Sequence, residues 1–270
     1  MKRGVAAAKI NLALVVGPRR TDGRHELLTV YQRIALADRI QLRSSTRNDV
    51  TGFADDTLVA RALAALTEHD EARIRVHLDK RIPVAAGLGG GSADAAAALA
   101  LGNELLTRPL ASDRLDDIAR ELGADVPYFL RAGPQLGGGD GTELRPLDLP
   151  QDYWVVLVVP YDVEKSSTAD VYAQFDTGIR ADGFQARAAA LLSALERVRR
   201  PRDLAALPSN DLASSPVVDE LLSLGAFRAD VSGAGPAVYG LFLHRDRAGD
   251  AQRGLRGRGR TWLTAPAWYV

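Results

Sequence analysis

Hydrophobic positions in the first part of the chain alternate with polar or small ones, as they do in β-strands. Residues 5–16 alternate well enough to predict a strand, and a Thr-Asp-Gly turn at 21–23 joins it to a second apolar stretch over 27–40. Residues 74–78, Ile-Arg-Val-His-Leu, predict a further strand. The chain therefore begins with β-rich structure.

Helical spacing of apolar residues appears between and after these strands. Over residues 57–66 they recur every three or four positions, which predicts a helix. A second helix is predicted with Ser112 as its N-cap and Gly123 as its C-terminal stop. Pro127 suits the first turn of a short helix that follows. Asp125 is therefore expected at a junction between two helices.

A change in composition marks the middle of the chain. Residues 133–150 are dense in Gly and Pro and are predicted to be a crossover between two domains. The continuous apolar run at 154–159 then predicts a buried central strand. Helices are expected over 185–199 and 216–224, and a last strand over 238–243.

Composition narrows the class of protein. The chain has 270 residues, 46% of them hydrophobic, with 34 basic and 34 acidic side chains and no cysteine. No broad cationic field is present to recruit nucleic acid or a membrane surface, and disulfides and thiolate metal sites are excluded. Lys9 and Asn11 interrupt what would otherwise resemble the apolar core of a secretory signal. These features predict a cytoplasmic protein with neither a nucleic-acid nor a membrane partner.

A glycine-rich loop is the strongest chemical signal. Residues 83–94 have the sequence Pro-Val-Ala-Ala-Gly-Leu-Gly-Gly-Gly-Ser-Ala-Asp and precede an Ala-rich segment that predicts a helix, with Ser92 as its cap. Glycines allow close backbone approach, and the first N–H groups and dipole of a helix attract anions. The loop is therefore predicted to bind phosphate.

Two standard phosphate-binding templates do not fit this loop. No Gly-Lys-Ser/Thr closes it, as the P-loop requires, and the dinucleotide fingerprint would need an acidic residue about 20 positions further on. A flexible hinge is the alternative, but a hinge needs neither the preceding Pro nor the following helix former run.

A second loop of small residues, Ser-Gly-Ala-Gly-Pro at 232–236, falls between two strand-like runs. It is either an ordinary hairpin turn or, together with the first loop, the second wall of an anion site.

The N-terminal strand motif, the glycine loop and this C-terminal Gly-rich loop together resemble the three signatures of the GHMP kinase superfamily. The resemblance spans almost the whole chain. It implies an α+β (α/β two-domain) fold, with a ribosomal-protein-S5-like domain over 1–148, a ferredoxin-like α/β domain over 149–270, and the active site between them. Five further segments narrow it to one branch: Ala8-Lys9-Ile10-Asn11-Leu12, Asp22-Gly23-Arg24-His25, Asp79-Lys80-Arg81-Ile82-Pro83, Gly89-Gly90-Gly91-Ser92 and Leu122-Gly123-Ala124-Asp125-Val126-Pro127.

Members of that branch phosphorylate a tertiary hydroxyl of a cytidine-diphosphate-linked methylerythritol with ATP, in the non-mevalonate route to isoprenoid precursors. The resemblance implies that Asp125 accepts the hydroxyl proton and that Lys9 lies beside it. A positioned base contributes about 10² to 10⁴ in rate. The alternative is structural, with Asp125 capping the helix of Pro127 and Lys9 pairing with it.

The resemblance also implies the remaining site residues, with Mg²⁺ accompanying ATP and a monomer or weak homodimer as the assembly. ATP is expected along Pro83, Val84, Ala85, Ala86, Gly87, Leu88, Gly89, Gly90, Gly91, Ser92 and Ala93, with Thr57 and Lys80 near the nucleoside. Substrate is expected at Asn11, Arg24, His25, Thr168, Tyr172, Gly233, Ala234 and Gly235.

Several positions depart from the family pattern. Arg24 replaces an aromatic residue, so we expect cytidine to stack between Arg24 and Tyr172. Thr57 replaces an asparagine, and Asp140 and Thr142 lie in the altered Gly-x-Gly-Glu crossover. Two other functions stay open: a sister enzyme such as a homoserine, mevalonate or sugar kinase, and a nucleotide-binding module without transfer activity.

Overall fold

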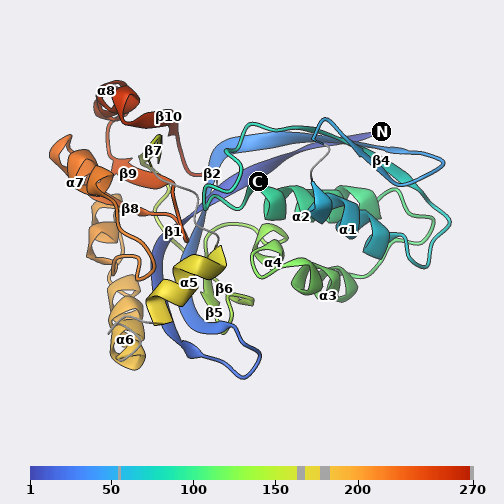
Figure 1. Ribbon diagram of the computed structural model, residues 1–270, viewed down its shortest axis with the longest axis horizontal. Helices are drawn as coiled ribbons and strands as arrows, with labels where there is room; N and C mark the ends of the chain where they lie inside the picture. Colours follow the sequence, from blue (N-terminus) through green and yellow to red (C-terminus); the bar gives the residue numbers. More distant parts are fainter. Residues whose placement is uncertain (54–55, 163–167, 177–182, 268–270) are drawn as a thin grey trace. The chain divides into compact units, whose positions relative to one another are not determined.

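The protein is described by a computed structural model that covers residues 1–53, 56–162, 168–176 and 183–267. It divides into two compact units (Figure 1). Unit 1 comprises Met1–Ala8, Leu36–Val84 and Gly89–Ala132, and unit 2 comprises Lys9–Ala35, Ala85–Leu88 and Gly133–Val270.

Two long strands contribute to both units. β1 (Lys2–Arg19) and β2 (His25–Ser44) each begin in one unit and end in the other. The units are therefore discontinuous in sequence, whereas the domains 1–148 and 149–270 stay a prediction. Within the described part of the chain, no helix combines the length and the apolar character needed to cross a membrane.

Unit 1 places helices against a small sheet. Its elements besides β1 and β2 are β3 (Asp49–Thr51), α1 (Thr57–Leu66), β4 (Ile74–Asp79), α2 (Gly90–Asn103), α3 (Ser112–Leu122) and α4 (Val126–Phe129). Residues 39–44 of β2 pair antiparallel with β4, and β3 pairs parallel with β4. The predicted helix over 57–66 and the predicted strand over 74–78 are confirmed.

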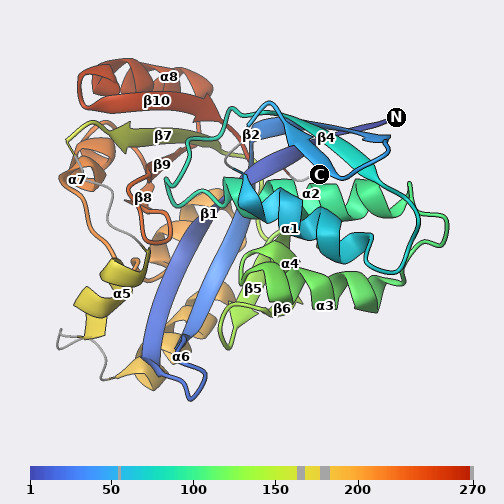
Figure 2. The same cartoon turned by 45° about the vertical axis from the view of Figure 1, so that its right-hand side comes forward.

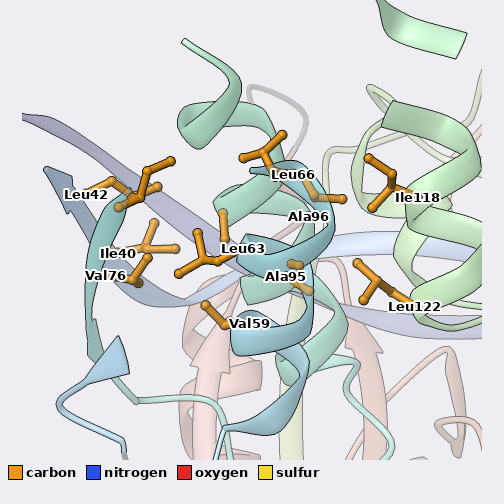
Figure 3. Packing of buried hydrophobic residues seen from close by; sticks show 14 of the residues in the cluster. Ile40, Leu42, Val59, Leu63, Leu66, Val76, Ala95, Ala96, Ile118 and Leu122 are labelled. Atoms are coloured by element: carbon orange, nitrogen blue, oxygen red, sulfur yellow. The ribbon is translucent and has the colours of Figure 1, made fainter. Parts of the chain in front are cut away.

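The core of unit 1 explains why these elements form. Leu63 of α1 packs toward the strands that contribute Ile40 and Val76, while Ile118 and Leu122 of α3 pack against α2 (Figure 3). The facing side chains of α2 are alanines, and their small size lets the helices approach closely. The apolar spacing seen in the sequence is the buried stripe of each helix.

Two predicted N-caps are wrong. α2 begins at Gly90, and its N-cap is Gly89 in the left-handed conformation, so Ser92 already lies in the first turn. Ala111 precedes α3 in extended conformation and makes no side-chain cap, so Ser112 is the first helical residue. Backbone conformation, rather than a hydroxyl, starts both helices. Gly123 is confirmed at the C-terminal end of α3.

Unit 2 contains most of the second half of the chain. Besides β1 and β2, its elements are β5 (Gln135–Gly138), β6 (Glu143–Pro146), β7 (Trp154–Pro160), α5 (Thr168–Asp176), α6 (Phe184–Leu195), η2 (Pro201–Ala206), α7 (Pro216–Ser223), β8 (Arg228–Val231), β9 (Val238–Phe242), α8 (Arg245–Gly254), η3 (Leu255–Gly257) and β10 (Gly259–Thr264). The predicted strand over 154–159 and the helices over 185–199 and 216–224 correspond to β7, α6 and α7.

Four of these strands form an antiparallel sheet in the order β10-β7-β9-β8. α7 and α8 pack on one face (Figure 2), where Val156 and Val158 of β7 meet Leu221 and Ala251. β7 is an inner strand whose middle residues are buried on both faces, which accounts for its continuous apolar sequence. This strand order confirms the expected ferredoxin-like arrangement and the α+β class.

The segment 133–150, predicted to be a crossover between domains, starts at a boundary between the two units and contains regular structure. This segment contains the hairpin β5–β6, and β5 pairs with residues 29–31 of β2. Gly139 and Gly141 adopt positive φ values of 64° and 101° in the turn. The glycines that suggested a linker are therefore those that a tight hairpin needs.

We predict that Leu63→Ala lowers the free energy of unfolding by about 2–5 kcal/mol, because removing a fully buried side chain leaves a cavity in the core of unit 1. Chemical denaturation gives this value directly. Leu58→Ala, one helical turn away and only half-buried, is the matched control and should cost clearly less. Equal losses for the two variants would contradict this account of the core.

Candidate active site

The middle of the glycine loop is held by its carbonyl oxygens. In unit 2, the carbonyl of Ala86 accepts a hydrogen bond from the Ala237 N–H (3.0 Å), and that of Leu88 accepts one from the Lys9 N–H (3.0 Å). The carbonyl of Gly87 between them accepts the Ser232 hydroxyl at 2.9 Å. Three successive carbonyls therefore accept hydrogen bonds from other parts of the protein.

Gly87 can be nothing other than glycine in this arrangement. Its φ is +79°, and an added Cβ would lie 2.2 Å from the carbonyl oxygen of Ser232. Ala85 also has a positive φ, 53°, which is a conformation uncommon for a residue with a side chain. The loop is therefore a fixed conformation, which favours phosphate binding over the hinge alternative.

The Ser-Gly-Ala-Gly-Pro segment at 232–236 is a hairpin turn that also contacts the glycine loop, and its role as a wall of an anion site stays a prediction. It connects the antiparallel strands β8 and β9, and Ser232 N–H donates to Ala237 O at 2.9 Å as in a hairpin. It also lies against Ala86 and Gly87 of the first loop. The two loops form one surface within unit 2.

The last part of the glycine loop belongs to unit 1 and opens α2. Gly89 has a φ of 69° and makes no side-chain cap, so the first N–H groups of this 14-residue helix depend on other partners. An added Cβ on Gly91 would meet nothing within 4 Å. This helix end can therefore receive an anion at close range.

Lys9 is a buried cation on β1, 4% exposed. Its Nζ donates to Asn11 Oδ1 at 2.6 Å and lies 5.7 Å from the centre of the Tyr31 ring. An added Cβ on Gly233 would come within 3.4 Å of both Lys9 Nζ and Asn11 Oδ1. The structure therefore brings together three of the predicted site residues, Lys9, Asn11 and Gly233.

Thr29 completes this group, and the motifs did not reveal it. The Asn11 amide nitrogen donates to Thr29 Oγ1 at 2.7 Å, and that hydroxyl donates to Ala13 O at 2.8 Å. This series of hydrogen bonds directs Asn11 Oδ1 toward Lys9. The only sequence signal was a polar residue in an apolar strand.

Asp125 lies half-buried at the start of α4 in unit 1. Its side chain makes no capping hydrogen bond to the helix. The structural alternative, in which Asp125 caps this helix, is therefore not supported. Its approach to Lys9 stays a prediction.

Lys80 lies in a cluster of charges at the start of the glycine loop. Its Nζ is 2.5 Å from Asp38 Oδ2 and also bonds to Asp94 on α2. Asp38 Oδ1 accepts the N–H groups of Arg81 and, at 2.8 Å, Ile82. Asp38 and Asp94 are fully buried. Lys80 precedes the glycine loop and Asp94 is its last residue, so their ion pair joins the two ends of the loop. The predicted contact of Lys80 with ATP stays a prediction.

Burial controls the protonation of this cluster. It raises the pKa of the Asp94 carboxyl to about 7; the Lys80 ammonium opposes the rise, while Asp38 and Asp56 add to it. Burial also lowers the pKa of Lys80, but attraction to the two carboxylates outweighs it and the net shift is upward. Asp94 Oδ1 is buried and accepts no hydrogen bond. A proton on Asp94 therefore relieves an excess of negative charge.

A second group of predicted residues gathers in unit 2 around His25. Its ring stacks on Tyr172 with centroids 4.9 Å apart and 24° between the planes, and Phe175 meets it edge-on. His25 Nε2 lies 2.7 Å from Asp176 Oδ1. The structure therefore brings His25 and Tyr172 together. Their rings stack on one another, whereas Tyr172 was expected to stack on cytidine.

Arg24 pairs with Asp140 in the β5–β6 turn. Arg24 departs from the family pattern, whereas Asp140 occupies the variable position of the Gly-x-Gly-Glu pattern. The ion pair joins Arg24 to this turn. Stacking of Arg24 on a base stays a prediction.

The other predicted residues are less informative. Thr57 is the exposed first residue of α1. Thr168 begins α5, but its side chain lies outside what the structure describes. Among the described residues, no three or more His, Cys, Asp or Glu side chains are grouped as metal ligands.

Comparison with protein families identifies the class. The model of the GHMP kinase N-terminal domain matches residues 57–133, and that of the GHMP kinase C-terminal domain matches residues 186–261. With the fold described above, the chain belongs to the GHMP kinase family.

Individual relatives narrow the comparison further. A 4-diphosphocytidyl-2-C-methyl-D-erythritol kinase of Anaeromyxobacter dehalogenans is 39% identical over 280 residues, 95% of this chain and 85% of the relative. A crystal structure of 4-(cytidine 5'-diphospho)-2C-methyl-D-erythritol kinase matches with a TM-score of 0.80 and 32% identity, covering 98% of this chain and 99% of its own. A mevalonate kinase structure matches with a TM-score of 0.75, 98% and 99% coverage but 12% identity, which is a likeness of fold.

We predict that Gly87→Ala distorts the loop, because the new methyl group cannot occupy the space of the Ser232 carbonyl. The strain of a positive φ and this clash together should cost about 1–3 kcal/mol of stability. The KM for ATP should rise at least about tenfold, since a misplaced binding group costs on that scale. Gly254→Ala, where nothing lies within 4 Å of the added Cβ, should change neither quantity.

We predict that Asp94→Asn becomes more stabilising, relative to wild type, as pH rises from 5 to 8. The ordinary pKa of an aspartate is 3.8 and that of Asp94 is about 7, so at pH 5 the folded protein holds a proton that the unfolded chain has already lost, and it releases this proton as pH rises to 8. Stability contributed by Asp94 therefore falls as pH rises, and the neutral amide escapes this loss. Thermal unfolding at both pH values measures it.

Asp79→Asn is the control for this experiment. A hydrogen bond from Arg81 lowers the pKa of Asp79, so its titration lies below pH 5. The difference in Tm between Asp79→Asn and wild type should stay constant from pH 5 to 8. A constant difference for Asp94→Asn as well would contradict the account of the buried cluster.

Proposed function

We propose that this chain transfers the terminal phosphoryl group of ATP to the 2-hydroxyl of 4-diphosphocytidyl-2-C-methyl-D-erythritol. The observation that supports this most is the identity of 39% with a relative of that name over 95% of the chain. The 32% identical structure with the corresponding title supports the same substrate. The product would serve the non-mevalonate route to isoprenoid precursors.

The two glycine loops and the start of α2 provide the phosphate site in this proposal. The carbonyls of residues 86–88 are bonded inside the protein, so they do not present lone pairs to an incoming phosphate. The N-terminal N–H groups and dipole of α2 attract the anion. Phosphoryl transfer needs such positioning and charge stabilisation, with no covalent intermediate.

Lys9 and Asp125 are the proposed catalytic pair. Asp125 accepts the proton of the attacking hydroxyl, and the Lys9 ammonium stabilises the negative charge that develops on the transferred group. Asn11 and Thr29 support this role, because their hydrogen bonds fix the position of Lys9 Nζ.

Magnesium would neutralise charge on the ATP phosphates. It prefers oxygen ligands in octahedral geometry and keeps several waters. Since the described residues offer no group of three metal-binding side chains, phosphate oxygens and water would supply most of its ligands.

His25 and Tyr172 are proposed to recognise the cytosine of the substrate. In unit 2 their rings stack on one another, and Phe175 meets the His25 ring edge-on. An aromatic face stacks on a base, and the imidazole nitrogens can hydrogen-bond to its edge. Arg24 would add a planar cation to this group. Location in the cytoplasm and a monomeric or weakly dimeric state stay predictions.

We predict that the wild-type protein releases ADP with 4-diphosphocytidyl-2-C-methyl-D-erythritol and not with homoserine or mevalonate. Asp125→Asn should bind ATP as the wild type does and lose about 10² to 10⁴ in kcat, because it cannot accept the proton. Coupled ADP release and calorimetric titration measure the two quantities. Turnover with homoserine or mevalonate alone would reject the substrate, and an unchanged kcat would remove Asp125 as the base.

A further inference from the structure

The segment that follows η2 contains a buried asparagine, Asn210, whose polar atoms are all used. It is 5% exposed. Its Nδ2 donates to the carbonyls of Val231 (3.0 Å) and Gly233 (2.6 Å), and its Oδ1 accepts the Leu212 N–H at 2.8 Å. One side chain thus joins this segment to the end of β8 and to the loop that follows it.

The bond to the Gly233 carbonyl fixes a residue that borders Lys9. The same residue is so close to Lys9 and Asn11 that an added Cβ would lie 3.4 Å from an atom of each. One residue earlier, Ser232 bonds to Gly87 of the glycine loop. Asn210 therefore fixes the loop residue that borders Lys9.

Asp211, the next residue, holds the strand on which Lys9 lies. Its N–H donates to Leu14 O at 2.9 Å, and its Oδ2 accepts the Val16 N–H at 2.9 Å. Arg187 bonds to the same Oδ2 and to the Val16 carbonyl, at 3.0 and 2.8 Å. Asn210 is therefore bonded to the 232–236 loop, and the next residue, Asp211, is bonded to β1.

The segment itself is anchored independently of the Asn210 side chain. The Asn210 N–H donates to Asp230 Oδ2 at 2.9 Å. Asp230 pairs with the buried Arg228, whose guanidinium bonds to three carbonyls at residues 204, 207 and 208. Removing the amide group should therefore loosen the 232–236 loop without releasing the segment.

We propose that Asn210 is a positioning residue for phosphoryl transfer, which sets the distance between the Gly233 backbone and the Lys9 ammonium. This inference rests on the proposed function. Asparagine suits the role because its NH₂ group donates to two carbonyls at once, which a carboxylate of the same shape cannot do. No local sequence pattern marks Asn210, since the carbonyls to which it donates are more than 20 residues away in the sequence.

The test compares Asn210→Ala, Asn210→Ser and Asn210→Asp in ADP release with ATP and the cytidylylated substrate. Asn210→Ala should lower kcat by about 10²-fold, the effect of displacing a reacting group by an ångström. The KM for ATP should move by less than about threefold, because the Ser232–Gly87 bond persists. Asn210→Ser keeps one donor and should give an intermediate kcat.

Asn210→Asp adds a readout that a purely structural role would not move. Burial, the two carbonyls and the neighbouring Asp230 raise the pKa of the introduced carboxyl, and Arg228 opposes this from beyond Asp230. The protonated carboxyl can donate to one carbonyl, whereas the carboxylate repels both. The ratio of kcat for Asn210→Asp to that of wild type should therefore rise as pH falls from 8 to 6, while the ratio for Asn210→Ala stays flat.

Asn48→Ala is the matched control. Asn48 also bridges separate segments, through Thr67 Oγ1 at 2.7 Å and the Ile74 N–H at 2.9 Å, but in unit 1. It should lose comparable stability and keep kcat within about twofold. An Asn210→Ala or Asn210→Ser protein that is folded and keeps wild-type kcat would overturn the proposal. Wild type inactive on this substrate would instead reject the proposed function.

Discussion

The structure depends on how the glycine loop is fixed by its own carbonyl groups. At residues 86–88 three carbonyls in succession accept hydrogen bonds, from Ala237, the Ser232 hydroxyl and Lys9. In the middle of this run Gly87 has a positive φ and no room for a Cβ, so the conformation requires glycine there. The oxygens that would repel a phosphate are thereby directed into the protein.

The same bonds connect elements that are distant in sequence. The Lys9 N–H holds the glycine loop to β1 while the Lys9 side chain contacts Asn11, so one residue both fixes the loop and places a cation close to it. At the start of the loop, Lys80 and Asp38 do comparable work in unit 1 with charges instead of backbone bonds. The net charge of the chain is zero, so this local arrangement, and not the overall field, must attract an anion.

Elements with a strong apolar period could be predicted from the sequence, because the period records which face is buried. This holds for α1 and β4, whereas β7 was predicted from a continuous apolar run because both of its faces are buried. The first residues of helices could not be predicted in this way. Gly89 and Ala111 precede their helices and make no side-chain cap, whereas nearby serines suggested caps. The β5–β6 hairpin was missed because glycines required by a turn have the same composition as a linker.

The candidate site divides in the same way. Lys9, Asn11 and the two glycine loops belong to short motifs and could be named in advance. Thr29 and Asn210 act through hydrogen bonds to backbone atoms far along the chain, so no local pattern reveals them. The Arg24–Asp140 ion pair shows the same limit, because it joins residues 116 positions apart and no local pattern reveals it.

The passage of β1 and β2 through both compact units has a consequence for how this protein can be divided. Neither unit is a single stretch of the polypeptide, and a cut after Ala132 would leave the amino-terminal fragment holding the strands that unit 2 needs. The protein is therefore unsuited to modular exchange of its halves with other enzymes by simple gene fusion. Any such chimera would have to replace the two strands together with the half they complete.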